Sequence, residues 1–281
     1  MLAVAASVLS LFALADLNGT VVFSNNLGGV ANYRIPAVVQ TGVGSTGGKP
    51  PAIVAFAEAR DGGDSSASRI AARSSTDAGS SWSPVVFAAG SAVKSASCTK
   101  ANITSCRAGN PAAVFDSATD EIVLLYVARG FGSGEDPVGN GMVKSSDGGL
   151  TWTPPIDVSD GFGAACGSMP GPGTALQLSA AGPHKGRLLV ASHHGAYQHD
   201  YVTMSDDNGG SWKTIAQTFP KMDEAALTEL PNGEVLLNMR HGASPKQGRG
   251  KQIIVQSCFQ TSGSCAVVRS DVGCVSRRGG A

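Results

Sequence analysis

Short apolar runs, separated by polar and glycine-rich stretches, alternate along almost the whole of this chain. Runs of this kind, rich in Val, Ile and Leu and bounded by turn residues, are typical of β-strands. No long segment repeats its apolar positions with the 3.6-residue period of an amphipathic helix. The pattern therefore predicts an all-β fold built from short strands. We expect these strands at residues 21–23, 33–39, 51–57, 70–73, 112–115, 122–127, 141–144, 187–191, 201–204, 234–238 and 252–256.

An eight-residue phrase recurs in the chain and ends each time on one of its 3 tryptophans. The copies occupy residues 75–82, 145–152 and 205–212, and their shared pattern is Ser-x-Asp-x-Gly-x-Ser/Thr-Trp. We call this phrase the Asp box. A phrase that returns at intervals of 70 and 60 residues indicates a repeat architecture.

The Asp box has a physical explanation as a turn. Its Asp carboxylate can accept hydrogen bonds from nearby backbone N–H groups, and its Gly supplies a position with positive φ. The Trp ring packs beneath the turn. A strand-like run precedes each copy, so each box is expected to form a hairpin turn within a small antiparallel sheet. Repeated small sheets predict a β-propeller, in which the Asp and Trp residues have a structural role.

Composition narrows the class of protein. The chain of 281 residues is 42% hydrophobic and 15% charged and has 37 glycines, which is typical of a globular, turn-rich domain. Its length fits one large all-β domain. The formal net charge is zero and basic residues do not gather into a long run, so nucleic acid is not expected as a partner.

The first residues predict entry into the secretory pathway. Residues 1–15 are almost wholly apolar and end on Ala-Leu-Ala before Asp16, which resembles a signal-peptide cleavage site although a basic start is missing. A membrane anchor is the alternative, but the run is too short to span comfortably. Two Asn-x-Thr acceptors, at Asn18 and Asn102, fit a lumenal or extracellular route. We expect a lysosomal or extracellular protein without stable membrane insertion after cleavage.

Cysteine and histidine positions predict one disulfide and no metal site. Cys98 and Cys106 bracket a short loop and are the best candidates for a disulfide. The Cys and His spacings do not match a structural zinc site. His193, His194 and His199 lie close together without nearby carboxylates, which favours surface or site-lining residues over metal ligands.

Three motifs together resemble one enzyme family. They are Tyr-Arg-Ile-Pro at 33–36, Phe-Ala-Glu-Ala-Arg at 56–60 and the Asp boxes that follow. Over residues 20–256 the chain is similar to the exo-α-sialidases of animals and bacteria. The resemblance implies a six-bladed propeller, of which residues 16–256 would form about four blades, followed by a divergent, poorly ordered tail at 257–281.

The resemblance also implies an activity. Exo-α-sialidases hydrolyse terminal sialic acids from glycoproteins, glycolipids or oligosaccharides, so the expected partner is a sialylated glycan and no cofactor is expected. Sialic acid carries a carboxylate, which a guanidinium can hold bidentately at any physiological pH. Arg34 and Arg240 match two of the family's carboxylate-binding arginines, and Arg60 matches an arginine that supports the site floor. Surface or structural roles are the alternatives for these arginines.

Carboxylates at two places match the family's catalytic groups. The general acid is an Asp in the loop after residues 56–60, which Asp64 matches, with Asp61 as the runner-up because Gly62 and Gly63 leave the spacing open. The family uses a Tyr nucleophile that a Glu activates. Glu224 matches this Glu, whereas Glu229 is expected to be structural.

One departure from the family pattern concerns the nucleophile. The family's Tyr and third Arg lie well downstream of the activating Glu, but the four tyrosines here, Tyr33, Tyr126, Tyr197 and Tyr201, all precede Glu224. Arg269, Arg277 and Arg278 have no matching context. Three interpretations remain: an exo-α-sialidase or a fragment of one, a non-catalytic sialic-acid binder, and a structural propeller.

Overall fold

The computed structural model of this protein describes residues 19–42, 49–63, 66, 68–92, 97–130, 137–162, 168–179, 181–194, 199–241, 251–256 and 266–269. These residues form four consecutive units of four antiparallel strands, which we call blades 1 to 4. The predicted all-β propeller fold is confirmed. Among the described residues, no helix is long and apolar enough to cross a membrane.

Each blade is a meander in which consecutive strands pair. Blade 1 contains β1 (Asn32–Gln40), β2 (Ile53–Arg60), β3 (Ser68–Ser75) and β4 (Val86–Ala89). Blade 2 contains β5 (Arg107–Asp116), β6 (Glu121–Arg129), β7 (Pro137–Ser145) and β8 (Ile156–Asp157). Blade 3 contains β9 (Met169–Gln177), β10 (Leu188–His194), β11 (His199–Ser205) and β12 (Lys213–Pro220). Blade 4 contains β13 (Met222–Glu229), β14 (Val235–His241), β15 (Lys251–Gln256) and β16 (Ala266–Arg269).

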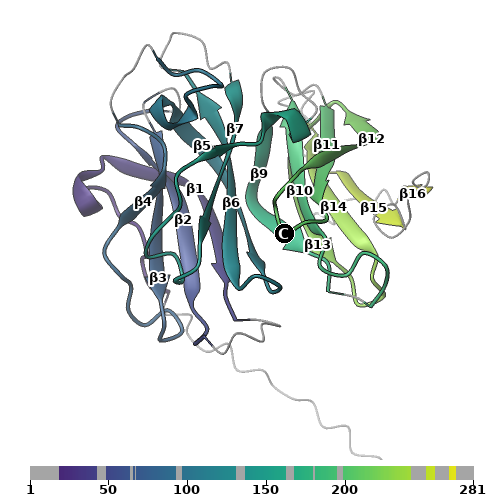
Figure 1. The fold of residues 1–281 in the computed structure, drawn as a ribbon, viewed down its shortest axis with the longest axis horizontal. Coiled ribbons are helices and arrows are strands. Elements are labelled where there is room, and N and C mark those ends of the chain that lie inside the picture. The colour runs from purple at the N-terminus through teal and green to yellow at the C-terminus, as the bar shows by residue number, and fades with distance from the viewer. Residues whose placement is uncertain are drawn as a thin grey trace, which may run out of the picture.

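The first strand of each blade is the inner one. β1, β5, β9 and β13 contact one another across the blades, and β5 pairs with β9 in parallel through Ala112 and Gly173. This pairing joins blades 2 and 3 into one eight-stranded sheet. Figure 1 shows blades 1 and 2, in purple to teal, on one side of the molecule and blades 3 and 4, in green to yellow, on the other.

The hydrophobic core is divided into clusters that lie between neighbouring blades. Phe56 and Leu124 belong to the cluster between blades 1 and 2, and Leu125 and Leu188 to the cluster between blades 2 and 3. Leu237 belongs to the cluster between blades 3 and 4. Successive residues of a strand point to opposite faces, so β6 supplies both of its neighbouring clusters. This explains its unbroken apolar run, because a strand buried on both faces needs no polar alternation.

All three Asp boxes form the predicted hairpin turns. Asp77 Oδ1 accepts the backbone N–H of Ser81 at 2.9 Å, and its Oδ2 accepts the Ser81 hydroxyl at 2.5 Å. The second and third boxes repeat both bonds. The hydroxyl of Ser81 is the largest cause that lowers the pKa of Asp77 to about 2. The box glycine has positive φ in each copy, at Gly79 (88°), Gly149 (86°) and Gly209 (83°).

The tryptophans of the boxes differ in burial. Trp212 is buried, whereas Trp82 and Trp152 are half-buried. Trp82 donates its indole N–H to the carbonyl of Gly79 at 3.1 Å, and Trp152 donates to Gly149 at 3.2 Å. Trp82 and Trp152 therefore pack beneath their own turns through these bonds, whereas the Trp212 ring lies beneath Gly209 with its indole N–H unpaired among the described residues.

The observed strand positions correct two expectations. Residues 21–23 do not form a strand, because an apolar run without a pairing partner has no ladder to join. Residues 266–269 form β16 and pair with β15, within the segment that the sequence predicts to be poorly ordered. The remainder of that tail and the predicted signal peptide lie outside the described residues. Outside strands, the described chain has the short 3-10 helices η1 (Leu27–Gly29), η2 (Ile103–Ser105) and η3 (Ser159–Phe162).

Candidate active site

Polar contacts between blades show that the inner strands begin at the same end of the propeller. Glu58, which pairs with Arg34 near the start of β1, accepts the backbone N–H of Asn110 in the first half of β5 at 2.6 Å. His193, which pairs with the first residue of β9, has its Nε2 3.4 Å from Oδ1 of Asp223 near the start of β13. We call this the site end. The Asp boxes follow the third strands and so lie at the opposite, Asp-box end.

Irregular backbone marks the site end of the blades. The pairing register shifts in the inner strands at Arg34/Ala37 of β1, at Gly109/Ala112 of β5 and at Asp223/Ala225 of β13, and β9 shifts against β10. Such bulges turn side chains away from the regular alternation and are frequent next to active sites. Ile35 has a φ of 53° within the β1 bulge, which is a strained conformation for a β-branched residue. Strain of this kind accumulates at functional sites.

Blade 1 places three of the predicted site residues together. Arg34 is exposed on β1, and Asp61 is exposed directly after β2. Arg60 is only 6% exposed, and its Nε donates to Oε2 of Glu58 at 2.6 Å. Its Nη2 forms an ion pair with the same oxygen. Arg60 therefore lies beneath the surface, paired with Glu58.

The loop that carries the predicted general acid is described only in part. Asn32 donates its side-chain N–H to the carbonyl of Gly62 at 2.9 Å, and the N–H of Gly62 donates to Ser66 at 3.1 Å. These bonds fix the start of the loop beside Arg60. Asp64 lies outside the described residues.

Blade 4 brings Glu224 and Arg240 into contact. Oε2 of Glu224 lies 2.9 Å from Nη1 of Arg240, and Oδ2 of Asp223 contacts Nη2 of the same guanidinium. In a regular strand two consecutive side chains would point to opposite faces. The bulge between Asp223 and Ala225 removes this alternation, so both carboxylates reach one arginine. Burial raises the pKa of Glu224 above its usual value.

Two ionisable side chains that are uncharged at neutral pH, His193 and Asp200, lie near the pair of Asp223 and Arg240. Burial, followed by the positive charges of Arg129 and Arg240, lowers the pKa of His193 to about 4. Burial raises the pKa of Asp200, which is 0% exposed, to about 8, although Arg240 opposes this shift. His193 and Asp200 pair across β10 and β11. At neutral pH the region therefore contains a neutral imidazole and a protonated carboxyl group.

The described tyrosines occupy structural positions. The hydroxyl of Tyr33 donates to the carbonyl of Leu27 at 2.7 Å. Tyr126 and Tyr201 are 1% and 3% exposed, and burial raises the pKa of Tyr201 to about 12. Tyr197 lies outside the described residues. A buried phenol with a raised pKa is a poor nucleophile, which argues against Tyr126 and Tyr201 in that role, whereas the hydroxyl of the half-buried Tyr33 is bonded to Leu27.

The histidine cluster has carboxylate neighbours, so the expectation that it lacks carboxylate support is wrong. Asp223 and Asp200 come from β13 and β11, which pack against His193. Within the described ranges, no group of three or more His, Cys, Asp or Glu side chains is arranged to hold a metal ion. His194 and His199 lie with their ring centroids 5.6 Å apart.

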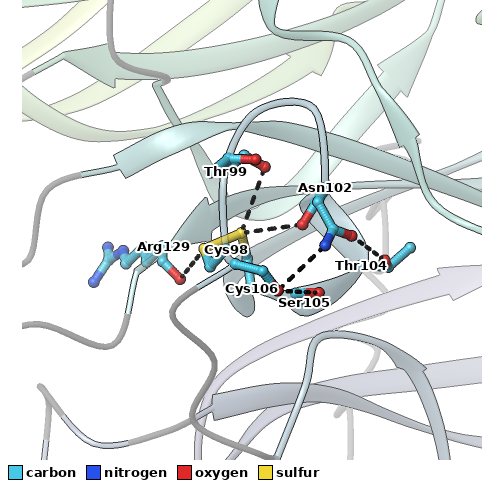
Figure 2. Close-up of a disulfide and its surroundings, with 8 residues drawn as sticks. Cys98, Thr99, Asn102, Thr104, Ser105, Cys106 and Arg129 are labelled. Carbon is cyan, nitrogen blue, oxygen red and sulfur yellow. Dashed lines mark hydrogen bonds between the residues drawn. A yellow bond between two sulfur atoms is a disulfide. The ribbon is translucent and has the colours of Figure 1, made fainter.

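A disulfide closes the loop beside the site end, and Figure 2 shows its surroundings. Cys98 and Cys106 are joined at an S–S distance of 2.12 Å, which confirms the predicted pairing. Sγ of Cys98 lies 3.4 Å from the carbonyl oxygen of Arg129, where β6 ends. In the same loop, the hydroxyl of Thr104 donates to Oδ1 of Asn102 at 3.0 Å.

A cavity of about 480 Å³ lies at the Asp-box end, between blades 1 and 2. Trp82, Phe115 and Lys49 line it, together with hydroxyl groups of both boxes. Nζ of Lys49 lies 3.0 Å from the Asp120 carboxylate. This cavity is separate from the predicted site residues, which lie at the other end.

Sequence reasoning missed Asp223 and Asp200 around the site and named His193 only as a surface or site-lining residue. Asp223, His193 and Asp200 are buried polar residues whose proximity depends on which strands pair, and their local sequence carries no sign of it. Glu58 could have been found, because it lies two residues before Arg60 on one strand and so shares its face.

Comparisons with known proteins agree with this architecture. Residues 51–263 match the family model described as the BNR repeat-like domain. A sialidase of Micromonospora viridifaciens is 32% identical over 246 residues, which are 78% of this chain and 34% of that protein. The chain thus spans about a third of the length of this relative.

Solved sialidase structures share the fold. A Hadza microbial sialidase aligns with a TM-score of 0.64 and 22% identity over 86% of this chain and 47% of its own. The leech intramolecular trans-sialidase, complexed with 2,7-anhydro-Neu5Ac, aligns with a TM-score of 0.63 and 17% identity over 86% of this chain and 51% of its own. For Trypanosoma rangeli sialidase with the inhibitor DANA, the TM-score is 0.62 and the identity 18%, over 86% of this chain and 38% of its own.

The matches to these three solved structures cover about half of each solved chain or less. The chain belongs to the BNR repeat-like domain family and is a homologue of sialidases that covers part of a sialidase propeller.

Proposed function

We propose that this chain is part of an exo-α-sialidase, a glycoside hydrolase that removes terminal sialic acids from glycoproteins, glycolipids or oligosaccharides. The contact between Glu224 and Arg240 carries the proposal, because it joins an activating carboxylate to a carboxylate-binding guanidinium. Arg34 and Arg60 lie at the same end of the propeller, on blade 1. The sialidase relatives and the ligands in two of the solved structures support a sialic acid as the bound sugar.

Arg34 and Arg240 are proposed to bind the carboxylate of the sugar. Both are exposed, and a guanidinium can bind a carboxylate bidentately. Arg60 is committed to Glu58 and acts below them by holding the floor of the site. A charge-assisted hydrogen bond of this type contributes about 1.5–3 kcal/mol.

The chemical steps divide between blades 1 and 4. Asp64 is proposed to protonate the leaving oxygen, with Asp61 as the alternative acid on the same loop. Glu224 is proposed to act as the base that activates the nucleophile, and its raised pKa suits a group that exchanges protons. The tyrosine nucleophile is proposed to come from sequence beyond these 281 residues, since the relatives are longer than this chain.

A specific observation favours a second candidate, a non-catalytic sialic-acid binder. The carboxylate-binding arginines are present, but no tyrosine follows Glu224 in the 281 residues. Binding needs only the arginines, whereas turnover needs the arginines and a nucleophile.

Calorimetry with N-acetylneuraminic acid and hydrolysis of a fluorogenic sialoside together test the proposal. We expect this chain to bind the sugar and to hydrolyse the sialoside weakly or not at all, because acid catalysis alone contributes about 10²–10⁴-fold. A version extended to the length of the relatives should be active. Arg34→Ala should weaken binding by roughly tenfold to a hundredfold.

Arg187→Ala, at the Asp-box end, is the matched control, since Arg187 bonds Asp206 far from the site. Equal binding by Arg34→Ala and the unsubstituted chain would contradict the proposed pocket. Robust turnover by this chain, abolished by Asp64→Ala, would show that another group replaces the expected nucleophile.

We also propose that the protein follows the secretory pathway to a lysosomal or extracellular destination. The disulfide supports an oxidising compartment, and Asn102 lies in the loop that it closes. Expression with residues 1–15 intact should yield a glycosylated product whose mobility increases after endoglycosidase treatment. The Asn102→Gln variant should lose at least part of that shift, and a product without glycan would contradict this route.

A further inference from the structure

The guanidinium of Arg240 is shared by two carboxylates that differ in burial. The Asp223 side chain, which contacts Nη2, is 3% exposed, whereas the Glu224 side chain beside Nη1 is 37% exposed. The side chain of Arg240 is itself 51% exposed. One edge of the guanidinium is therefore anchored in the interior, and the other lies beside a carboxylate that water can reach.

The buried partner is fixed from a second blade. Nε2 of His193 lies 3.4 Å from Oδ1 of Asp223, whereas Nη2 of Arg240 contacts Oδ2. The lowered pKa of His193 keeps the imidazole neutral above about pH 4, so it does not compete with Arg240 as a cation. Asp223 thus has one charged partner and one neutral partner.

The two ion pairs differ in how easily they are broken. A buried carboxylate that loses its partner remains desolvated and uncompensated, which is strongly unfavourable. A half-exposed pair gains little over hydration of its members and is readily exchanged. An incoming carboxylate is therefore expected to displace Glu224 from Arg240 and to leave Asp223 in place.

We propose that Asp223 is a positioning residue that holds Arg240 in the orientation required for carboxylate recognition, while Glu224 is the exchangeable partner that a ligand carboxylate displaces. The nature of the ligand, a sialic acid, rests on the proposed function. The anchoring of Arg240 by Asp223 is independent of it.

The first test needs no ligand. Nitrogen-15 relaxation of the Arg240 Nε–H group, assigned by its absence from the spectrum of Arg240→Lys, reports how rigidly the guanidinium is held. We expect an ordered group in the unsubstituted chain and in Glu224→Gln, and a mobile one in Asp223→Asn. An equally ordered group in Asp223→Asn overturns the proposal.

The second test measures binding of N-acetylneuraminic acid at pH 7. Asp223→Asn should bind the sugar roughly tenfold to a hundredfold more weakly, because the guanidinium of Arg240 is no longer oriented. Glu224→Gln should bind at least as tightly as the unsubstituted chain, since the competing charge is gone, although it should not support turnover. Weaker binding by Glu224→Gln would contradict the displacement of Glu224 by the ligand carboxylate and overturn that part of the proposal.

Asp116→Asn is the matched control, because Asp116 is 0% exposed but lies at the Asp-box end of β5. It should leave both the Arg240 relaxation and the binding unchanged. Loss of either in this control would assign the effects of Asp223→Asn to general loss of stability and overturn the proposal.

The two measurements separate this inference from the proposed function. An unsubstituted chain that fails to bind the sugar refutes the proposed function, and the relaxation data still decide whether Asp223 orients Arg240. If Asp223→Asn does not fold, Arg240→Lys decides, because an ammonium lacks the planar guanidinium that can bond Asp223 on one edge and a ligand carboxylate on another. A loss of tenfold or more is then expected, and full retention of binding overturns the proposal.

Discussion

Single residues at the site end are held in protonation states that differ from those in water. Asp200 is buried with a pKa raised to about 8, and neither of its oxygens has a hydrogen-bond partner among the described residues. His193, across the strand pair, has its pKa lowered to about 4. Burial is the largest cause of both shifts, because it disfavours the charged form of either group. Asp200 and His193 are therefore both uncharged next to Arg240 at neutral pH.

Asp200 makes stability depend on pH. In the unfolded chain this carboxyl titrates near the usual aspartate pKa of 3.8, whereas in the native state its pKa is about 8, so the native state keeps a proton that the unfolded state has lost. The stability that this proton contributes is complete below the unfolded pKa and falls as pH rises towards 8. Asp200→Asn removes the titration. Relative to the unsubstituted chain, it should gain on the order of 3 kcal/mol between pH 5 and pH 7.5, at about 1.4 kcal/mol per pH unit.

Urea unfolding at both pH values measures this gain. Asp116→Asn is the control, because Asp116 accepts hydrogen bonds from Gln177 at 2.7 Å and from Thr119 at 2.8 Å. It should lose stability at pH 5 and at pH 7.5. A gain by Asp200→Asn that does not grow with pH would refute the assignment of a protonated Asp200.

The same residues show how far sequence reasoning reaches into the site. Motifs located Arg34, Glu224 and Arg240, because each stands in a short pattern that the family shares. The contact between Asp223 and His193 was not predicted, since it depends on β10 packing against β13, which no local pattern specifies. Whether a charged side chain is buried is decided by strand register and not by its neighbours in sequence.

At the scale of elements, strands buried on both faces are the easiest to predict. β2, β6 and β10 have long apolar runs and were expected close to their observed positions. The outer strands β4, β8, β12 and β16 were missed, and so were the inner strands β9 and β13. β4 and β8 have only 4 and 2 residues, and β9 contains two prolines and two glycines, so these strands lack a recognisable apolar run. The bulges at the site end were also missed, since a register shift leaves no mark on hydropathy.

The Asp boxes act as elements that join blades as well as turns. The hydroxyl of Ser74 on blade 1 donates to the carbonyl of Gly148 in the second box at 2.5 Å. A Cβ on Gly149 would lie 2.8 Å from Cγ1 of Val54 in blade 1, whereas a Cβ on Gly79 would meet only Trp82, at 3.8 Å. The two glycines occupy the same place in their boxes and have nearly equal φ. Substitutions at these two glycines therefore separate the stability cost of a side chain within the turn from its cost through contact with the neighbouring blade.

Alanine substitutions at these glycines should differ in effect. Gly79→Ala introduces a residue at positive φ and should cost about 1–2 kcal/mol of unfolding free energy. Gly149→Ala carries the same strain and also overpacks against Val54, which should add about 1–3 kcal/mol. Denaturant unfolding measures both, and Val54→Ala should lessen the cost of Gly149→Ala. Equal costs at the two glycines would contradict close packing of the second box on blade 1.

At the scale of the whole molecule, the blades form a row in which three core clusters are each shared by two neighbours, while a fourth cluster lies within blade 1. The first and last blades each share one such cluster, while the middle blades share two. Repeat architectures of this kind are stabilised by each unit and by its interfaces with its neighbours. Protection against hydrogen exchange is then expected to be greatest in the middle strands of blades 2 and 3 and to fall towards β4 and β16.

Leu124 and Leu125 test this row directly, because they are consecutive, both 0% exposed, and point to different interfaces. Leu124→Ala opens a cavity against blade 1, and Leu125→Ala opens one against blade 3. Each should cost about 2–5 kcal/mol in unfolding free energy. Hydrogen exchange should show the first variant losing protection in β2 and the second in β10, so each serves as the control of the other. Identical exchange patterns in the two variants would mean that the blades unfold as one cooperative unit rather than through separable interfaces.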